Sequence, residues 1–332
     1  MTSIKVCKYF IKSSPVGELH EVLDDIGKVL GSNDFLQTQD IKDQLREYYE
    51  AHKLHLTFSD GTTALVSAQG RQEPIVKYVQ SEVPVSGGAG ATQQPKKVSL
   101  FSGDDDEDEY GAEKQQVEAE PEEQQPVQQY AQEEVREDFV YYDPVKKLKF
   151  SFDPITLEAR VEEENVDWET QFLAPETVSL RDDIVKAMNS YLNRQFRKGT
   201  TEFGVYCNAD GSEIRIEISC HNLNFKSFWG GEWLSTWVIT PVAGTISGSI
   251  KIRNHYFESG NIQFNMGKDF PNAKLRANTA RAIVDHLSKE ETNYQDGLED
   301  MYTEVSERLL KGMRRIMPIT RTKFDWGRPQ LL

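Results

Sequence analysis

A stretch of 46 residues without proline, residues 272–317, constrains the fold of this chain more than any other feature. Its apolar side chains recur at helical spacing, at Ala280, Val284, Leu287, Tyr294, Leu298, Met301, Val305, Leu309, Met313 and Ile316. One continuous helix of this length would be roughly 70 Å long. The five strands expected before it would make a sheet only about 20–25 Å across. The sequence therefore predicts that the helix breaks, at Gly297 or Gly312, or that it crosses a second sheet supplied by another subunit.

The residues before this helix, 202–268, show the alternation of β-strands. Within residues 213–223 the apolar and polar side chains fall on opposite faces, with Ile214, Ile216, Ile218 and Cys220 on one face and Arg215, Glu217, Ser219 and His221 on the other. Turn residues separate strands that follow one another directly along the chain. This series predicts an antiparallel meander whose apolar face the following helix covers. The expected fold class is therefore α+β.

The N-terminal region predicts short helices and a hairpin. Breaks at residues 13–15 and 31–34 separate apolar stripes at Leu19, Val22, Leu23, Ile26, Val29 and Leu30, and at Ile41, Leu45, Tyr48 and Tyr49. Helices this short are expected to pack as a small antiparallel bundle. Further along, Asp60-Gly61 between two apolar runs predicts a β-hairpin. A longer helix is expected from Pro175 to Phe196, before a stop at Lys198-Gly199.

The acidic charge of the chain is concentrated in one segment. The net charge is −16, and residues 103–138 hold 15 acids and two bases, so the rest of the chain carries only −3. Such a composition cannot bury enough apolar area to offset chain entropy, so residues 82–138 are expected to be disordered. They are either a tolerated surface insertion, which is the favoured reading, or an interaction segment, with phosphorylation at Ser99 or Ser102.

These patterns divide the chain into eight expected segments. They are a helical stalk (1–53), a small β-hairpin region (54–81), the acidic insert (82–138), a β and loop region (139–174), a helix (175–199), the antiparallel sheet (200–270), one long helix or two (271–317), and a C-terminal end (318–332).

Composition and motifs exclude several classes of protein. The cysteines Cys7, Cys207 and Cys220 show no metal-ligand spacing, and no apolar run is long enough to span a membrane. The N-terminus lacks a hydrophobic signal core, so a soluble cytosolic protein is expected. No nucleophile elbow, phosphate-binding loop or zinc-protease motif is present. We therefore expect no enzyme, no catalytic residue, no metal and no cofactor.

Two rival functions depend on single features. A cytosolic hydrolase could use His221 or His255, and Cys220 beside His221 points to the opposite face of a strand. A nucleic-acid module could stack bases on the tryptophans of residues 228–237. The strands beside those tryptophans lack a basic stripe, so packing explains the aromatic residues better.

A basic cluster near the C-terminus is the strongest candidate site. It comprises Lys311, Arg314, Arg315, Arg321 and Lys323. Upstream, Glu304 precedes Arg308 by four residues and Glu307 precedes Lys311 by four, so those pairs can neutralise one another on a helix. Arg314 and Arg315 have no acid at that spacing. An unneutralised cluster is typical of a surface that binds an acidic partner, although cations also favour a helix C-terminus.

Three segments of the sequence resemble one known family. The ending RRIMPITRTKFDW (314–326) is similar to the signature ending of the α subunit of the heterodimeric F-actin capping protein, the CapZ family. NFKSFWGGEWLSTW (224–237) resembles the FWxGxWxSxW segment of that family, and HYFESGNIQ (255–263) resembles its HYYEDGNVQ segment. The three occur in the order of the family, and the similarity extends from the early helices through residues 149–153 to Trp326, interrupted only by the acidic insert.

The resemblance implies half of a pseudo-symmetric αβ heterodimer with a shared antiparallel sheet and an N-terminal stalk. It implies calcium-independent capping of filament barbed ends, which blocks gain and loss of actin subunits. The C-terminal tentacle would contact actin through Lys311, Arg315 and Arg321, with Arg314 and Lys323 in the same cluster. Implied partners are an obligate capping protein β subunit, the barbed end, and regulators such as CARMIL-type peptides, myotrophin-like proteins and phosphoinositides. The implied location is the cortical actin cytoskeleton. The acidic insert departs from the family pattern, and it is a candidate autoinhibitor of the basic tentacle.

Overall fold

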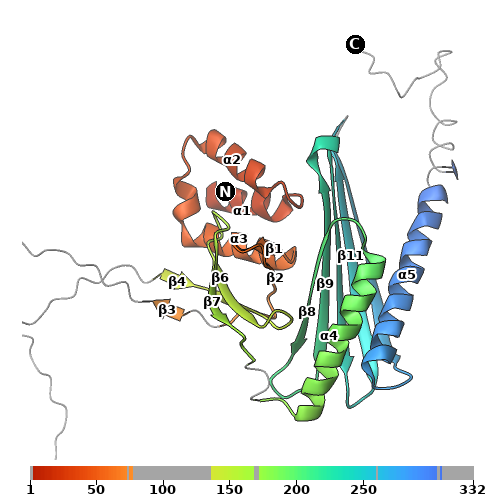
Figure 1. Cartoon of the computed structure of the whole chain (residues 1–332). Helices are drawn as coiled ribbons and strands as arrows, with labels where there is room; N and C mark the ends of the chain where they lie inside the picture. The colour runs from red at the N-terminus through yellow and green to blue at the C-terminus, as the bar shows by residue number, and fades with distance from the viewer. Residues whose placement is uncertain are drawn as a thin grey trace, which may run out of the picture. The chain divides into compact units, whose positions relative to one another are not determined.

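The computed structural model describes residues 3–72, 75–77, 136–167, 172–258, 261–304 and 307–308 (Figure 1). The chain divides into two compact units, residues 1–75 with 138–332, and residues 76–137. Apart from its last three residues, the predicted acidic insert lies outside the described residues, so its disorder stays a prediction. Those three residues form β4 (Arg136–Asp138), which pairs with β3 (Ile75–Lys77).

The N-terminal residues form the short helices that their apolar stripes predict. They are α1 (Ser3–Ser13), α2 (Leu19–Leu30), the 3₁₀ helix η1 (Asp34–Gln37) and α3 (Gln39–Ala51). Gly31 ends α2 in the left-handed region, at φ +74°, where a glycine avoids strain. In α3 all four stripe residues are buried, whereas in α2 Val29 is 86% exposed. The core-facing stripe of α2 therefore ends one turn earlier than the sequence indicates.

Two small sheets pack with these helices. The predicted hairpin at Asp60-Gly61 is confirmed: β1 (His55–Thr57) pairs with β2 (Thr63–Leu65). In its turn, the Asp60 carboxylate accepts hydrogen bonds from the backbone N–H and the hydroxyl of Thr62, both at 2.8 Å. A three-stranded sheet follows, made of β5 (Val140–Asp143), β6 (Leu148–Phe152) and β7 (Ala159–Glu164). Apolar side chains of the helices and of both sheets share one core.

The predicted meander is confirmed as a five-stranded antiparallel sheet in the order β12-β11-β10-β9-β8. Its strands are β8 (Thr200–Cys207), β9 (Ile214–Asn224), β10 (Trp229–Thr240), β11 (Thr245–Tyr256) and β12 (Ile262–Lys274). The predicted start of the long helix near residue 271 was wrong, because β12 continues through Pro271. Proline is tolerated there because β12 is an edge strand and its pairing with β11 shifts register at this point.

Two helices cover one face of this sheet, α4 (Pro175–Gln195) and α5 (Ala280–Glu304) (Figure 1). Between them and the strands lies the main apolar core, which includes the predicted face Ile214, Ile216 and Ile218 and the fully buried Trp237. The sequence predicted this cover from the long helix, but it did not predict that the α4 helix shares the same face.

The α5 helix lies along the strands rather than across them (Figure 1). Its successive turns contact β10 in reverse order: His286 contacts Trp237, and Tyr294 contacts Trp233. A helix of 25 residues is about 37 Å long, and a strand of 12 residues is about 40 Å long. The predicted mismatch with the width of the sheet therefore does not apply to the described part of α5.

The second face of the sheet buries charged groups as well as apolar ones. Glu232 on β10 is 2% exposed and meets His52 Nδ1 at 2.8 Å and Arg253 Nη1 at 3.0 Å. Burial alone would raise the pKa of Glu232. Hydrogen bonds with His221 and His52 and the charge of Arg253 lower it instead, to about 2. Glu232 is therefore an anion that fixes the end of α3 to the sheet.

A second buried acid, Glu217 on β9, continues this polar layer. Lys53 Nζ lies 3.4 Å from its carboxylate, and Ser67 Oγ donates to it at 2.6 Å. Burial lowers the pKa of Lys53, and the neighbouring Glu217 opposes that shift. A carboxylate buried this deeply needs such partners, because its desolvation is otherwise costly.

His55 completes the layer. Its ring stacks on His221 at 4.4 Å between centroids, and its Nε2 lies 2.9 Å from Ser219 Oγ. Burial, followed by the facing His221, lowers the pKa of His55 to about 3; Lys146 also lowers it, while a hydrogen bond with Ser219 and the charge of Glu232 act in the opposite direction. His55 is therefore neutral in the folded protein at neutral pH.

This burial predicts a pH dependence of stability. The folded pKa of His55 lies below the unfolded value of about 6.5, so the stabilisation is complete above that pH and is lost as the pH falls toward 3. In urea unfolding, His55→Gln should reduce the loss of stability between pH 7 and pH 5 by about 1–2 kcal/mol. His20→Gln, at an exposed position, is the control. Equal pH dependence in all three proteins would contradict the assignment.

Candidate functional site

The basic cluster predicted as the site lies outside the described residues. This holds for Lys311, Arg314, Arg315, Arg321 and Lys323 alike, so their role stays a prediction. The last described residues, 307–308, precede Lys311 by three residues in the sequence. There the predicted pair is present, because Arg308 Nη1 lies 3.3 Å from the Glu304 carboxylate. The helix that precedes the cluster in the sequence, α5, lies within the described residues.

The α5 helix is continuous through Gly297, so the break considered there was wrong. A side chain at Gly297 would have open space around it, so packing does not require a glycine at this position. The neighbouring turns pack on the sheet on both sides: Tyr294 meets the Trp233 ring, and Tyr302 meets Phe264. Tertiary packing thus supplies the stability that glycine removes from an isolated helix.

One buried carboxylate fixes α5 on the sheet. Glu291 is fully buried, and its carboxylate accepts hydrogen bonds from Tyr191 Oη on α4 (2.6 Å), Ser235 Oγ on β10 (2.6 Å) and Trp237 Nε1 (3.0 Å). Burial raises the pKa of Glu291, and the hydrogen bonds from these three donors only partly oppose that shift. Because the three donors come from two other elements, sliding or rotating α5 would break several hydrogen bonds at once.

The two edges of the large sheet differ. The β8 edge is covered, since Thr63 of the β2 strand and Lys146 both contact Glu202. The other edge, β12, pairs only with β11, and no second strand lies beside it among the described residues. It is also the longest strand of the sheet, and Ile262 at its start is 61% exposed. An open edge of this length presents unpaired backbone groups to another chain.

The histidines considered for a hydrolase occupy structural positions. His221 Nε2 lies 3.1 Å from the His52 carbonyl oxygen and 3.3 Å from Ser219 Oγ. That serine is fully buried, so the serine–histidine contact cannot reach a substrate. His255 pairs with Glu18 and lies 3.0 Å from Asn261 Oδ1. The structure brings neither histidine to an accessible nucleophile.

The other alternative residues also pack. Cys220 is buried, and burial raises the pKa of its thiol, which keeps it in the unreactive protonated form. Of the tryptophans in residues 228–237, Trp237 is fully buried against Phe270. Trp229 and Trp233 are half-buried. Core packing therefore explains Trp237 completely and the other two only in part.

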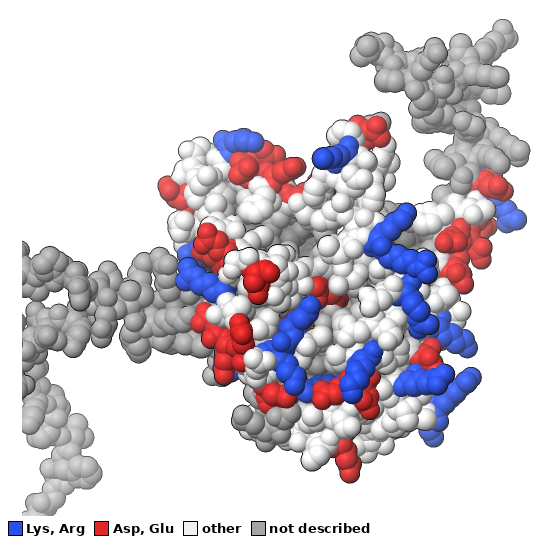
Figure 2. Space-filling view, viewed as in Figure 1, with Lys and Arg blue, Asp and Glu red and all other residues white. Residues whose placement is uncertain are grey.

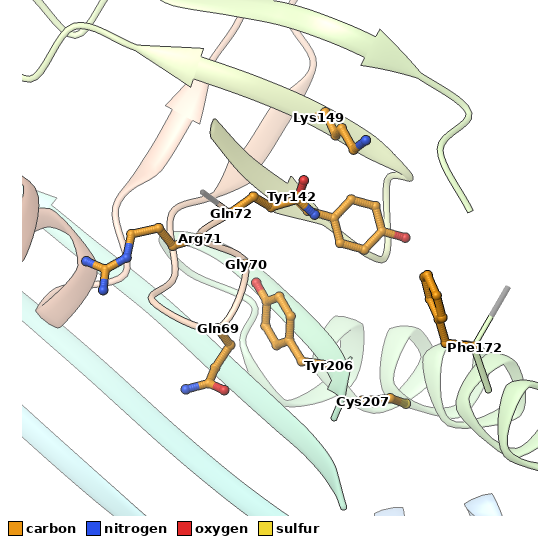
Figure 3. Close-up of a pocket in the computed structure, with 9 residues that line it drawn as sticks. All are labelled: Gln69, Gly70, Arg71, Gln72, Tyr142, Lys149, Phe172, Tyr206 and Cys207. Atoms are coloured by element: carbon orange, nitrogen blue, oxygen red, sulfur yellow. The ribbon is translucent and has the colours of Figure 1, made fainter. Parts of the chain in front are cut away.

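A pocket of about 460 Å³ lies beside β5 and β8 (Figure 3). The rings of Tyr142, Phe172 and Tyr206 line it, and the side chain of Arg71 points away from them toward Glu50, at 3.3 Å. Its described lining holds no carboxylate and no histidine, the side chains most often used for acid–base catalysis.

The described part of the chain offers neither a metal site nor a membrane-spanning helix. Within those residues no group of three or more histidine, cysteine, aspartate or glutamate side chains is arranged to hold a metal ion. None of the described helices is long and apolar enough to cross a membrane.

Comparison with known proteins identifies the family. The model of the F-actin capping protein alpha subunit family matches residues 7–88 and 102–331. Between these two stretches the match leaves out residues 89–101, so it includes most of the predicted insert and the whole basic cluster. The chain is 30% identical to the F-actin-capping protein subunit alpha of Neurospora crassa over 58% of its own length and 67% of that protein. For the Chaetomium thermophilum protein of the same name the values are 30%, 56% and 64%.

The fold has a counterpart among solved structures. The homodimeric actin capping protein alpha subunit of Plasmodium berghei superposes with a TM-score of 0.59 at 15% identity, covering 96% of this chain and 97% of that one. At that identity the likeness concerns the fold alone. Membership of the family is shown by the match to the family model, which runs through nearly the whole sequence. The chain belongs to the F-actin capping protein alpha subunit family.

Proposed function

We propose that this chain, paired with a capping protein β subunit, binds the barbed end of the actin filament and blocks subunit gain and loss without calcium. The observation that carries the proposal is the family match over residues 102–331, which includes Lys311, Arg315 and Arg321. Their positive charges would draw the complex to acidic actin surface and orient it, while apolar contacts limit dissociation. In this proposal Arg314 and Lys323 would act with them. This non-catalytic role fits the structural positions of the histidines.

The open β12 edge supports a partner that continues the sheet. Strand addition would satisfy the unpaired backbone groups of the longest strand and cover Ile262. Exposed aromatic side chains on α1, Tyr9 (68%) and Phe10 (49%), are consistent with a second contact in the helical stalk. A β subunit of similar fold would supply both contacts, which gives the pseudo-symmetric heterodimer.

The Glu291 anchor gives α5 a role in this function. The helix ends seven residues before Lys311, so its register on β10 would limit where the basic segment can lie. A loose α5 would spread that segment over many directions and reduce the share of encounters that succeed.

Further assignments follow from the family. The complex would act in the cortical actin cytoskeleton, where CARMIL-type peptides, myotrophin-like proteins and phosphoinositides would regulate it. The acidic insert would weaken capping if it binds the basic tentacle. Deleting residues 86–136 without any change in capping or its salt dependence would remove that last idea.

Capping is tested by elongation of pyrene-labelled actin from filament seeds, with the chain co-expressed with a β subunit. Substoichiometric complex should stop barbed-end growth equally with calcium or a calcium chelator. Arg315→Ala and Arg321→Ala should each weaken capping about 5-fold, because each removes a surface charge. Arg281→Ala, which removes an exposed charge at the start of α5, is the control. Unchanged capping in both cluster variants, or a large loss of thermal stability, would contradict their role.

The partner contact is tested by hydrogen exchange in the same complex. Amides of β12 should exchange as slowly as those of the central strand β10, because both would be paired on two sides. The β7 strand is the internal control, since it pairs only with β6. Fast exchange at alternate amides of β12, as expected for β7, would show that the edge stays open.

The Glu291 anchor is tested by two substitutions. Glu291→Leu leaves three buried donors without an acceptor and should cost about 3 kcal/mol or more of unfolding free energy. Glu291→Gln keeps one acceptor oxygen and should cost clearly less. If α5 positions the basic segment, Glu291→Leu should weaken capping more than Glu291→Gln does, under conditions in which both variants stay folded. Equal stability of the two variants would argue against the anchor.

A further inference from the structure

A groove of about 510 Å³ opens on the helix-covered face of the sheet, beyond the end of α4. It exists because α4 ends at Gln195, while β9, β10 and β11 continue past it. Trp229 and Trp233 lie four residues apart on β10 and face the same side. Gly231 lies between them and leaves a hollow, which Asn222 and Asn254 flank as its cross-strand neighbours. We call this site the tryptophan groove.

The rim of the tryptophan groove is basic. Arg194, Arg197 and Lys198 are exposed, and none forms an ion pair with a described residue. Arg194 Nε and Arg197 Nε donate only to backbone oxygens, at 3.2 and 3.3 Å. Figure 2 shows basic side chains gathered over this end of α4. Cations favour a helix C-terminus, but that effect does not explain the aromatic hollow beside them.

No acid neutralises this rim from within the groove. The carboxylate nearest in the lining belongs to Glu232, and its oxygens bond His52 and Arg253 on the opposite face of the sheet. The groove therefore combines an apolar floor, the side-chain amides of Asn222 and Asn254, and three cations that pair with no described acid. Such a site fits a peptide segment that carries one apolar side chain and several carboxylates.

The groove lies at the end of the sheet where α5 finishes. The α5 helix starts near Pro241, which accepts a hydrogen bond from Asn278, and reaches Phe264 through Tyr302. Tyr294 on α5 packs against the Trp233 ring, so Trp233 lies between the groove and α5. Seven residues of chain reach at most about 25 Å, which limits the distance from Glu304 to Lys311.

We propose that the tryptophan groove is a second filament-binding element, which takes an acidic segment of the terminal actin subunit. An apolar side chain of that segment would fill the hollow over Gly231, with its carboxylates at Arg194, Arg197 and Lys198. Asn222 and Asn254 would bond its backbone. The inference rests on the proposed capping function and adds to it a site outside the C-terminal cluster. Charge complementarity favours actin over the basic segment of this chain, which the same cations repel.

The charge of the rim is tested with the triple variant Arg194→Ala, Arg197→Ala, Lys198→Ala in complex with a β subunit. Capping should weaken about tenfold at low salt, mainly through slower association, and the difference should shrink at high salt. The matched control is Lys186→Ala, Arg281→Ala, Lys289→Ala, which removes the same charge from exposed positions of α4 and α5. It should cap as the wild type does.

The hollow is tested separately with Gly231→Ala. A methyl group there would lie 3.0 Å from Asn254 Oδ1, a contact that a small rotation of the amide relieves, so the strand should stay folded. Because the change fills the hollow and removes no charge, it should weaken capping several-fold and leave its salt dependence unaltered. Thermal melting checks that the fold is intact.

The outcomes separate this inference from the proposed function. Wild-type complex that fails to cap would overturn the capping function, and the groove proposal with it. Wild-type capping together with unchanged capping by the triple variant and by Gly231→Ala would overturn the groove alone. Normal capping by a triple variant that no longer binds vesicles containing anionic lipid would assign the rim to a membrane surface, and would also overturn the proposal.

Discussion

The hydrogen bonds to Glu291 are the interaction on which the helical side of the structure depends. A single carboxylate, fully buried, holds α5, α4 and β10 together through Tyr191, Ser235 and Trp237. Apolar packing alone would let α5 slide along the strand, because dispersion contacts are not directional. The buried acid converts that packing into one register. The position of Glu304, the last residue of α5, follows from this register.

On the opposite face of the sheet, buried charged groups hold the covering residues in place, whereas apolar packing does so on the helical face. Glu217 and Glu232 are both buried there, and each pairs with an N-terminal residue, Glu217 with Lys53 and Glu232 with His52. A layer of this kind specifies one docking geometry, because displacing one partner leaves the other as an unpaired charge in surroundings of low dielectric constant. It also makes the attachment sensitive to acid through His55. The two faces thus differ in chemistry as well as in what covers them.

The tertiary structure gives different roles to the tryptophans of one segment. Trp237 belongs to the core, whereas Trp229 and Trp233 border a hollow that exists because residue 231 is glycine. The strands themselves carry no basic stripe, and the cations beside the hollow come from the end of α4. This juxtaposition is invisible along the sequence, since residues 194–198 and 229–233 belong to separate elements.

The sequence by itself determined the strands, the turns, the apolar face of β9 and the family, because side-chain periodicity and motif spacing are local properties. It also located the basic cluster, whose geometry lies outside the described residues. The tertiary structure decided that α5 runs along β10, that Pro271 belongs to an edge strand, and that Glu217 and Glu232 are buried. Alternation tells which side chains share a face, but it carries no information on what covers that face. Only packing between distant segments settles whether a polar face meets water or other charged groups.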